Sequence, residues 1–252
     1  MLPSIILHFG IIKKDVYSYS QLSDKEKTAI KNNLSFLTYL DSLQTNNIPN
    51  VTSFVTAPEI TQLLTLQAAD EAIHNQSYAY IIESIIPKHE REDVYYLFKN
   101  NHDLLSRFKY ISGLYEDFSE VKTMENFFQA LIANFILEGI YFYNGFMFFY
   151  NLAHQNKMLD MSNQIRYINR DELVHLKLFS RIIMHFKDEF PDFYDSALVK
   201  NLFSRAVEEE IRWNKTIIDE SIKGITHESI EQHTKFLANE RQSMLDEHHI
   251  NE

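Results

Sequence analysis

Apolar residues recur at helical spacing along most of this chain, and no stretch of useful length alternates between apolar and polar positions as a strand does. The interruptions of this pattern contain proline, glycine or asparagine. The segments between them predict long helices at about residues 23–43, 58–86, 90–118, 122–153, 162–186, 192–223 and 229–246. We expect the third segment to be interrupted near Asn100 and Asn101.

Local signals support the first two helices. Ser23 and Glu26 have the spacing of a capping box, in which each side chain bonds the other residue's backbone N–H. Pro58 falls in the first turn of the next helix, where its missing N–H costs nothing. Between the two helices, the run Asn46-Asn-Ile-Pro-Asn50 predicts a loop.

Composition agrees with a helical chain. Only 5 glycines and 5 prolines occur in 252 residues, below the usual shares of about 7% and 5%. A hydrophobic content of 45% supports a large core, and no linker or repeat divides the chain. We therefore expect one all-α domain spanning residues 1–252.

Charge and cysteine content exclude several functions. A net charge of −11 argues against a nucleic-acid-binding surface. The absence of cysteine excludes disulfides, thiolate metal sites and thiol catalysis within this chain, and favours a cytoplasmic location. The apolar start, MLPSIILHFGIIKK, lacks an early basic region and a cleavage site, so we do not interpret it as a signal peptide.

One segment is long and apolar enough to suggest a membrane span. Residues 131–153 contain a single charged residue, Glu138. The segment also contains Asn134, Asn144 and Asn151, and no basic residues flank it closely. We interpret it as the buried central helix of a bundle, whose glutamate is stabilised by metal, and we expect no membrane association.

The strongest chemical signal is a pair of Glu-x-x-His segments. Glu71 and His74 form one, and Glu172 and His175 form the other. Residues three apart lie on the same face of a helix, so each segment presents a carboxylate beside an imidazole. Two such segments, with one carboxylate from each of two further helices, are the ligand set of a dinuclear metal site in a four-helix bundle.

Asp41 and Glu138 are the candidates for the two further carboxylates, because each lies in an otherwise apolar helical stretch. Oxygen-rich ligation with added imidazole suits iron or manganese. A single Glu-x-x-His pair usually lies on a solvated helix face. Two such pairs in apolar sequence surroundings indicate metal binding instead. The other nine histidines lack this context, and we expect the run Glu208-Glu-Glu210 to be a solvated helix face.

With these residues and their sequence neighbours, the chain resembles the small, radical-generating subunit of class I ribonucleotide reductase, a member of the ferritin-like superfamily. The matching segments are LTYLDSLQTNNIPN, APEITQLLTLQAADEAIHNQSYAYII, LEGIYFYNGFMFFY and INRDELVHLKLF. The resemblance implies a ferritin-like four-helix bundle with additional helices and a dinuclear metal site in its core. It covers nearly the whole chain, from about residue 20 to residue 247.

The resemblance also implies a role for each matching residue. One metal ion would be bound by Asp41, Glu71 and His74. The other would be bound by Glu138, Glu172 and His175, with one or more carboxylates bridging. Asp171 would hydrogen-bond the imidazole of His74 from outside the ligand set.

Tyr78, one helical turn after His74, matches the tyrosine that this family oxidises to a stable radical after the reduced metals react with dioxygen. Phe142, Phe146 and Ile168 match the apolar pocket that shields the radical. The cofactors implied are two iron ions, or alternatively iron with manganese or two manganese ions, with dioxygen as oxidant.

The same resemblance implies two protein partners. Nucleotide reduction in this family uses cysteines on a separate large catalytic subunit, which this cysteine-free chain would supply with the radical. A homodimer is also implied. The chain would thus be part of a ribonucleoside-diphosphate reductase, an oxidoreductase active only with its large subunit and needed for deoxyribonucleotide synthesis.

Two departures from the family leave other interpretations open. The family has a tryptophan before the first core helix and a tyrosine in a C-terminal tail, whereas here the only tryptophan is Trp213 and the last tyrosine is Tyr194. The chain is either a truncated or split subunit, or radical transfer is altered. The alternatives are a related di-metal oxidase acting on a small ligand and a ferritin relative that stores iron or is not catalytic.

Overall fold

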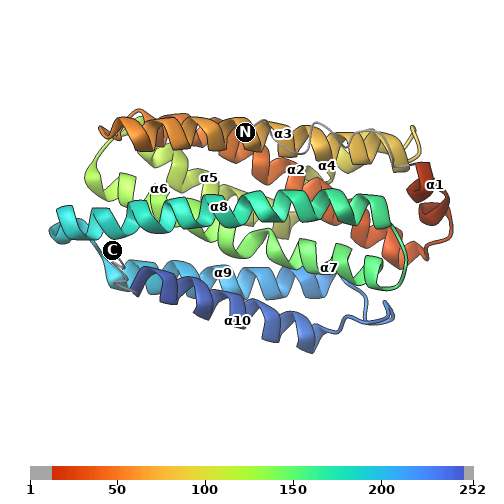
Figure 1. Ribbon diagram of the computed structural model, residues 1–252. Coiled ribbons are helices and arrows are strands. Elements are labelled where there is room, and N and C mark those ends of the chain that lie inside the picture. Colours follow the sequence, from red (N-terminus) through yellow and green to blue (C-terminus); the bar gives the residue numbers. More distant parts are fainter. Residues whose placement is uncertain (1–12, 247–252) are drawn as a thin grey trace.

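The computed structural model describes residues 13–246, and every regular element among them is helical (Figure 1). The elements are α1 (Lys13–Ser20), α2 (Asp24–Thr52), α3 (Pro58–Ile85), α4 (Arg91–Asn100), α5 (His102–Glu120), α6 (Met124–Ile136), the π-helical turn η2 (Leu137–Tyr141), α7 (Tyr143–His154), α8 (Leu159–Glu189), the 3₁₀ turn η3 (Pro191–Phe193), α9 (Ser196–Ile217) and α10 (His227–Asp246). The expected all-α fold, a four-helix bundle with additional helices, is confirmed.

The bundle is built from α2, α3, α8 and the segment α6–η2–α7. α2 packs along α3, and α8 packs against α3 on one side and against α6, η2 and α7 on the other. α9 and α10 run roughly along the bundle axis and pack against η2, while α5 packs against α6 (Figure 1). Because four segments surround one apolar centre, side chains from all of them can meet there.

α2 begins as predicted but ends later. Ser23 and Glu26 form the predicted capping box. The predicted loop at residues 46–50 was wrong, because α2 continues through Pro49 to Thr52. Proline removes only one bond of the helical ladder, and the continued helix buries Ile48 and Val51 completely.

The central apolar segment is not one uniform helix. The predicted helix at residues 122–153 is divided by the π-helical turn η2 between α6 and α7. By length and composition, Met124–His154 could cross a membrane, but 94% of its most apolar window is buried inside the bundle. A π-helical turn inserts a residue into the helix and turns side chains to new directions. Here it carries Glu138.

The remaining boundaries differ from the predictions by a few residues, apart from α1, which was not predicted. The interruption near Asn100 is confirmed, since α4 ends there and the Asn101 side chain caps α5. α9 starts at Ser196 rather than at Asp192, because Asp195 bonds the first free N–H groups, and it ends at Ile217 rather than near Lys223.

Candidate metal centre

Six buried side chains from four segments meet in the bundle. They are Asp41 of α2, Glu71 and His74 of α3, Glu138 of η2, and Glu172 and His175 of α8. Their ligand atoms form two groups, Asp41 with Glu71 and His74, and Glu71 with Glu138, Glu172 and His175, within each of which the atoms lie within 4.8 Å of one another. No member is more than 3% exposed. We call these six residues the metal cluster, and Glu71 belongs to both groups.

Each imidazole turns its Nδ1 atom toward the carboxylates. His74 Nδ1 lies 3.0 Å from Glu172 Oε1 and 3.7 Å from Glu71 Oε2. His175 Nδ1 lies 3.0 Å from Glu71 Oε1 and 3.0 Å from Glu172 Oε2. Each histidine therefore contacts the glutamate of the other Glu-x-x-His segment as well as its own, which brings the two segments together as one site.

The opposite nitrogen of each imidazole faces an aspartate. His74 Nε2 lies 3.6 Å from Asp171 Oδ2, and His175 Nε2 lies 3.5 Å from Asp70 Oδ2. Such a carboxylate keeps the proton on Nε2 and leaves the Nδ1 lone pair for a metal ion. The sequence analysis identified Asp171 but missed Asp70, although both precede a Glu-x-x-His segment and the repeated Asp-Glu-x-x-His pattern could have revealed both.

Crowding shifts the pKa values of the carboxyl groups in the metal-free chain. Burial and the neighbouring Glu71 raise the pKa of Asp41 well above its usual range, and burial with Glu71 and Glu172 does the same to the pKa of Glu138. Burial also opposes the charged form of Glu172, but contacts with Glu138 and the histidines outweigh it and lower the pKa of Glu172. The carboxyl groups cannot all be ionised at low cost without added positive charge.

The pKa values of both imidazoles are raised, although burial alone would lower them. Burial disfavours the charged form of His74, but Glu172 and Asp171 outweigh it and raise its pKa well above the usual value. For His175, burial is likewise outweighed, by Asp70 first and then by the glutamates, and its pKa is also raised. In the metal-free chain these protons supply positive charge that metal ions would replace.

Several ligand atoms make no hydrogen bond among residues 13–246, although two of them, His74 Nδ1 and Glu172 Oε1, lie 3.0 Å apart. They are both Oδ atoms of Asp41, Oε2 of Glu71, Nδ1 of His74, Oε2 of Glu138 and Oε1 of Glu172. Leaving a buried polar atom unpaired costs about 1–3 kcal/mol. Two divalent cations would give these atoms partners and would balance the four carboxylates. The donor set of carboxylates and imidazoles suits iron or manganese, so the residues present fit a dinuclear metal site.

Two amides and a phenol adjoin the metal cluster, and the sequence analysis missed all three. Gln44 and Gln67 donate from Nε2 to Glu138 Oε1, at 2.5 Å and 2.9 Å. Tyr115 donates to Gln44 Oε1 at 2.9 Å. Gln44 and Gln67 lie one turn from Asp41 and Glu71, and this spacing was the available signal.

Tyr78 lies on α3, four residues after His74, and its side chain is fully buried. Its hydroxyl has no hydrogen-bond partner in the described part of the chain. Burial, and next the charge of Asp41, raise the pKa of Tyr78 well above its usual value. The phenol is therefore protonated, shielded from water and within the electrostatic influence of the metal cluster.

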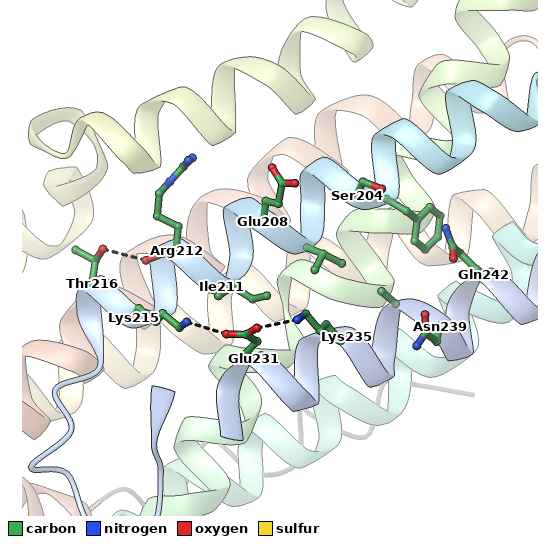
Figure 2. A pocket seen from close by; sticks show the side chains of 13 residues that line it. Ser204, Glu208, Ile211, Arg212, Lys215, Thr216, Glu231, Lys235, Asn239 and Gln242 are labelled. Atoms are coloured by element: carbon green, nitrogen blue, oxygen red, sulfur yellow. Dashed lines mark hydrogen bonds and ion pairs between the residues drawn. The ribbon is translucent and has the colours of Figure 1, made fainter. Parts of the chain in front are cut away.

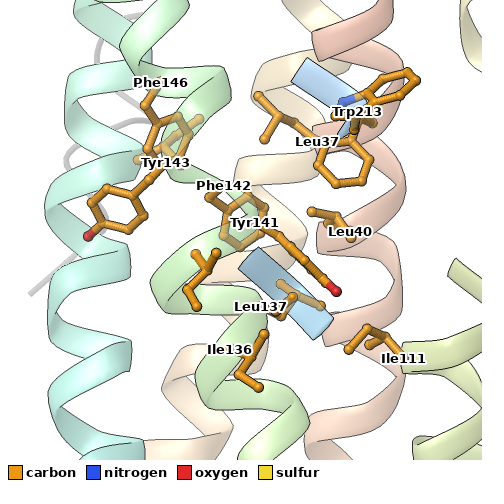
Figure 3. Close-up of a cluster of buried hydrophobic side chains, with 14 of the residues drawn as sticks. Leu37, Leu40, Ile111, Ile136, Leu137, Tyr141, Phe142, Tyr143, Phe146 and Trp213 are labelled. Atoms are coloured by element: carbon orange, nitrogen blue, oxygen red, sulfur yellow. The ribbon is translucent and has the colours of Figure 1, made fainter. Parts of the chain in front are cut away.

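The three apolar residues of the predicted shield are all buried. Phe142 and Ile168 are 0% exposed and Phe146 is 1% exposed. The rings of Phe142 and Phe146 lie parallel, with centroids 5.8 Å apart (Figure 3). They belong with Tyr78 to one cluster of buried apolar residues. That they shield Tyr78 stays a prediction.

Trp213, the only tryptophan of the chain, is part of the apolar core. It is 1% exposed and packs against Phe36, with ring centroids 6.0 Å apart. The guanidinium of Arg107 lies 5.8 Å from its ring. A neighbouring positive charge disfavours removal of an electron from the ring. Trp213 therefore packs as a structural residue, near Leu37 in the apolar core (Figure 3).

A groove of about 1000 Å³ lies between α9 and α10, and no residue of the metal cluster lines it (Figure 2). Its one fully paired carboxylate, Glu231, lies 2.9 Å from Lys215 Nζ and 2.7 Å from Lys235 Nζ. Two ammonium groups already balance this glutamate. The groove therefore lacks the excess of negative charge that marks the metal cluster.

Comparisons with known proteins agree with this geometry. A family profile described as "Ribonucleotide reductase, small chain" matches residues 11–250. The ribonucleoside-diphosphate reductase subunit beta of Treponema pallidum is 42% identical over 233 residues, which are 91% of this chain and 66% of that protein. The protein of the same name from Halalkalibacterium halodurans is 34% identical over 234 residues, which are 92% of this chain and 68% of that protein.

Solved structures show the same relationship. The ribonucleotide reductase R2 subunit from Clostridium botulinum superposes with a TM-score of 0.90 at 38% sequence identity, covering 96% of this chain and 78% of that chain. The chain spans about two thirds of the length of the two curated relatives, 66% and 68%.

Proposed function

This chain belongs to the ribonucleotide reductase small-chain family, and we propose that it is the subunit that generates the radical of a class I ribonucleotide reductase. One observation carries the proposal. A fully buried tyrosine, Tyr78, lies one helical turn from His74 of a cluster that fits two metal ions.

In this proposal the metal cluster would hold two ions. Asp41, Glu71 and His74 would hold one ion, and Glu138, Glu172 and His175 would hold the other. Glu71 belongs to both groups of ligand atoms. Asp70 and Asp171 orient the two imidazoles. When bound, the metals supply oxidising power from dioxygen, and the donor set is compatible with iron, manganese or one of each.

Tyr78 is the residue oxidised. Its high pKa keeps the phenol protonated, so the loss of an electron is accompanied by the loss of the phenolic proton. Complete burial keeps water and reductants away from the resulting phenoxyl radical. Phe142, Phe146 and Ile168 extend this apolar environment.

Reduction of a ribonucleotide takes place elsewhere in this proposal. The chain has no cysteine to carry out that chemistry, so the radical passes to a large catalytic subunit. The relatives are named as ribonucleoside-diphosphate reductase subunits, and we infer the same substrate class for the complex that contains this chain. We also propose a homodimer, a single domain over residues 1–252 and a cytoplasmic location.

Electron paramagnetic resonance tests the proposal. The purified chain is loaded anaerobically with ferrous iron and exposed to dioxygen, and its metal content is measured. We expect a tyrosyl signal with two metal ions per chain, lost in Tyr78→Phe. The control Tyr141→Phe removes another buried hydroxyl, which bonds Glu209 at 3.0 Å, and should retain the signal.

Two bound metals without a radical would favour an oxidase that acts on a small ligand. A signal that survives in Tyr78→Phe would show that another residue is oxidised.

A further inference from the structure

Glu138 is held by hydrogen bonds at only one of its two carboxylate oxygens. Oε1 accepts from Gln44 of α2 at 2.5 Å and from Gln67 of α3 at 2.9 Å. Oε2 has no hydrogen-bond partner among the described residues and lies 3.8 Å from His175 Nδ1. One oxygen is thus engaged by protein donors, and the other faces the ligand atoms of α8.

The Gln44 amide is held between Glu138 and Tyr115 of α5. The Tyr115 hydroxyl donates to Gln44 Oε1 at 2.9 Å, and Gln44 Nε2 donates to Glu138. A reversed amide would point its oxygen at the carboxylate oxygen and would lose the hydrogen bond to Glu138, while the phenol would become the acceptor from Nε2. Gln44 is 0% exposed and Tyr115 is 5% exposed, so water does not compete freely for these groups.

We propose that Tyr115 and Gln44 are positioning residues which, together with Gln67, tie Glu138 Oε1 so that Glu138 binds its metal ion through Oε2 alone. The inference rests on the proposed function, because it requires a metal ion at this position. The hydrogen bonds run from Tyr115 on α5 through Gln44 on α2 to the Glu138 carboxylate on η2. Glu138 is the one residue that η2 contributes to the metal cluster, and α5 contributes none.

The consequence is a defined coordination mode at one of the two metal positions. Two N–H donors on Oε1 compete with a metal ion for that oxygen. Without them, the carboxylate is free to rotate and to bind the metal through both oxygens. Losing a group that orients a metal ligand typically lowers metal affinity about 10-fold to 100-fold.

The test compares Tyr115→Phe and Gln44→Met with the matched control Tyr141→Phe. Tyr141 is also buried and its hydroxyl also makes one side-chain hydrogen bond, but to Glu209, outside the metal cluster. Each purified full-length variant is titrated with Mn(II), and crystals loaded with Mn(II) show how Glu138 binds. Unfolding of the metal-free variants is measured separately, to show that each one folds.

Both variants leave Gln67 as a donor to Glu138 Oε1. We expect Tyr115→Phe and Gln44→Met each to weaken binding of the ion at Glu138 about 10-fold, with Oε1 of Glu138 moved closer to the metal ion. The double variant should lose no more than the larger single loss, because both changes act through one oxygen. Tyr141→Phe should keep the affinity and the coordination of the unaltered chain.

Equal affinity and unchanged Glu138 coordination in Tyr115→Phe and Tyr141→Phe would overturn the inference. Losses that multiply in the double variant would also overturn it, because they would indicate two independent effects. If the unaltered chain binds two ions and forms the Tyr78 radical while the variants behave like the control, only this inference fails. If the unaltered chain binds no metal at the cluster, the proposed function fails with it.

Discussion

Two of the buried polar clusters in the described part of the bundle balance their charges in different ways. The second cluster, which we call the arginine cluster, consists of Arg107, Asn144, Glu210, Asn214 and Thr234. Arg107 pairs directly with Glu210, which also accepts from Asn214 at 2.7 Å. In the metal cluster, by contrast, the recorded ion-pair partners of the carboxylates in the described chain are the two histidines.

The Glu210 carboxylate of the arginine cluster has its own cation, although Nε and Nη1 of Arg107 and the Oδ1 atoms of Asn144 and Asn214 have no hydrogen-bond partner among the described residues. The Arg107 guanidinium lies over the rings of Phe36 and Tyr141, at 4.4 Å and 4.7 Å from their centroids. Asn144 joins Glu210 to Thr234 by hydrogen bonds. A buried anion that has its own cation and donors serves packing, whereas four carboxylates with unpaired oxygens require cations from outside.

Metal addition should show the largest contrast between the clusters. An ion at a free concentration about 100-fold above its Kd stabilises the folded state by about 2.7 kcal/mol, and two ions by twice that. We expect Mn(II) to raise the free energy of unfolding by this amount, and a chelator to reverse the change. Denaturant unfolding at fixed Mn(II) measures it. An equal gain in a variant lacking both Glu71 and Glu172 carboxylates would contradict the assignment.

Arg107→Leu should give the next largest effect. It leaves the buried Glu210 carboxylate without its cation, which costs about 3–5 kcal/mol of unfolding free energy. The number of metal ions bound per folded chain should not change, because Arg107 belongs to the other cluster. Denaturant unfolding and metal analysis check the two parts.

The double variant Arg107→Leu with Glu210→Leu is the control for that prediction. It removes both charges and should recover part of the lost stability. A double variant no more stable than Arg107→Leu alone would mean that packing, rather than an uncompensated charge, causes the loss.

The last expected effect is a dependence of stability on pH. Burial raises the pKa of Asp41 and Glu138, and carboxylates outweigh burial to raise that of His74 and His175. A raised pKa means that the folded chain holds protons that the unfolded chain has lost. As the pH rises, the metal-free chain should lose up to about 1.4 kcal/mol per pH unit for each group, starting above 3.8 for Asp41, above 4.5 for Glu138 and above 6.5 for the two histidines.

Metal binding displaces these protons, so stabilisation by Mn(II) should grow over the same pH range. The pKa of Glu210 in the arginine cluster is also raised by burial, and because Glu210 is not one of the metal-cluster residues we expect its contribution to cancel in the difference. Denaturant unfolding with and without Mn(II), at a series of pH values, measures both trends. A metal-free chain whose stability rises with pH above 6.5, where the carboxyl groups with lowered pKa no longer change the stability, would contradict the pKa directions.

The contrast between the clusters also explains what the sequence could reveal. Glu71 and His74 could be found because a ligand pair three residues apart is a local pattern. The run Glu208–Glu210 was expected to be solvated, and this prediction was wrong, since Glu209 and Glu210 are buried. The cation that makes burial of Glu210 possible is Arg107, 103 residues away in the chain, and no local pattern joins the two.

Other misses have similar physical causes. Gln44 and Tyr115 carry no charge pattern, and their connection to Glu138 appears only when α2, α5 and η2 are packed together. The loop expected near Pro49 was wrong because burial outweighed a local helix-breaking signal. The fold class, by contrast, depends on periodicity summed over many residues, and it was predicted.

Anomalous X-ray diffraction from crystals loaded with Mn(II) is the most direct test of the metal cluster. We predict two peaks, one bounded by Asp41, Glu71 and His74 and the other by Glu71, Glu138, Glu172 and His175, and none at the arginine cluster. A single peak, or manganese bound only elsewhere on the chain, would contradict the assignment of these six residues as a dinuclear centre.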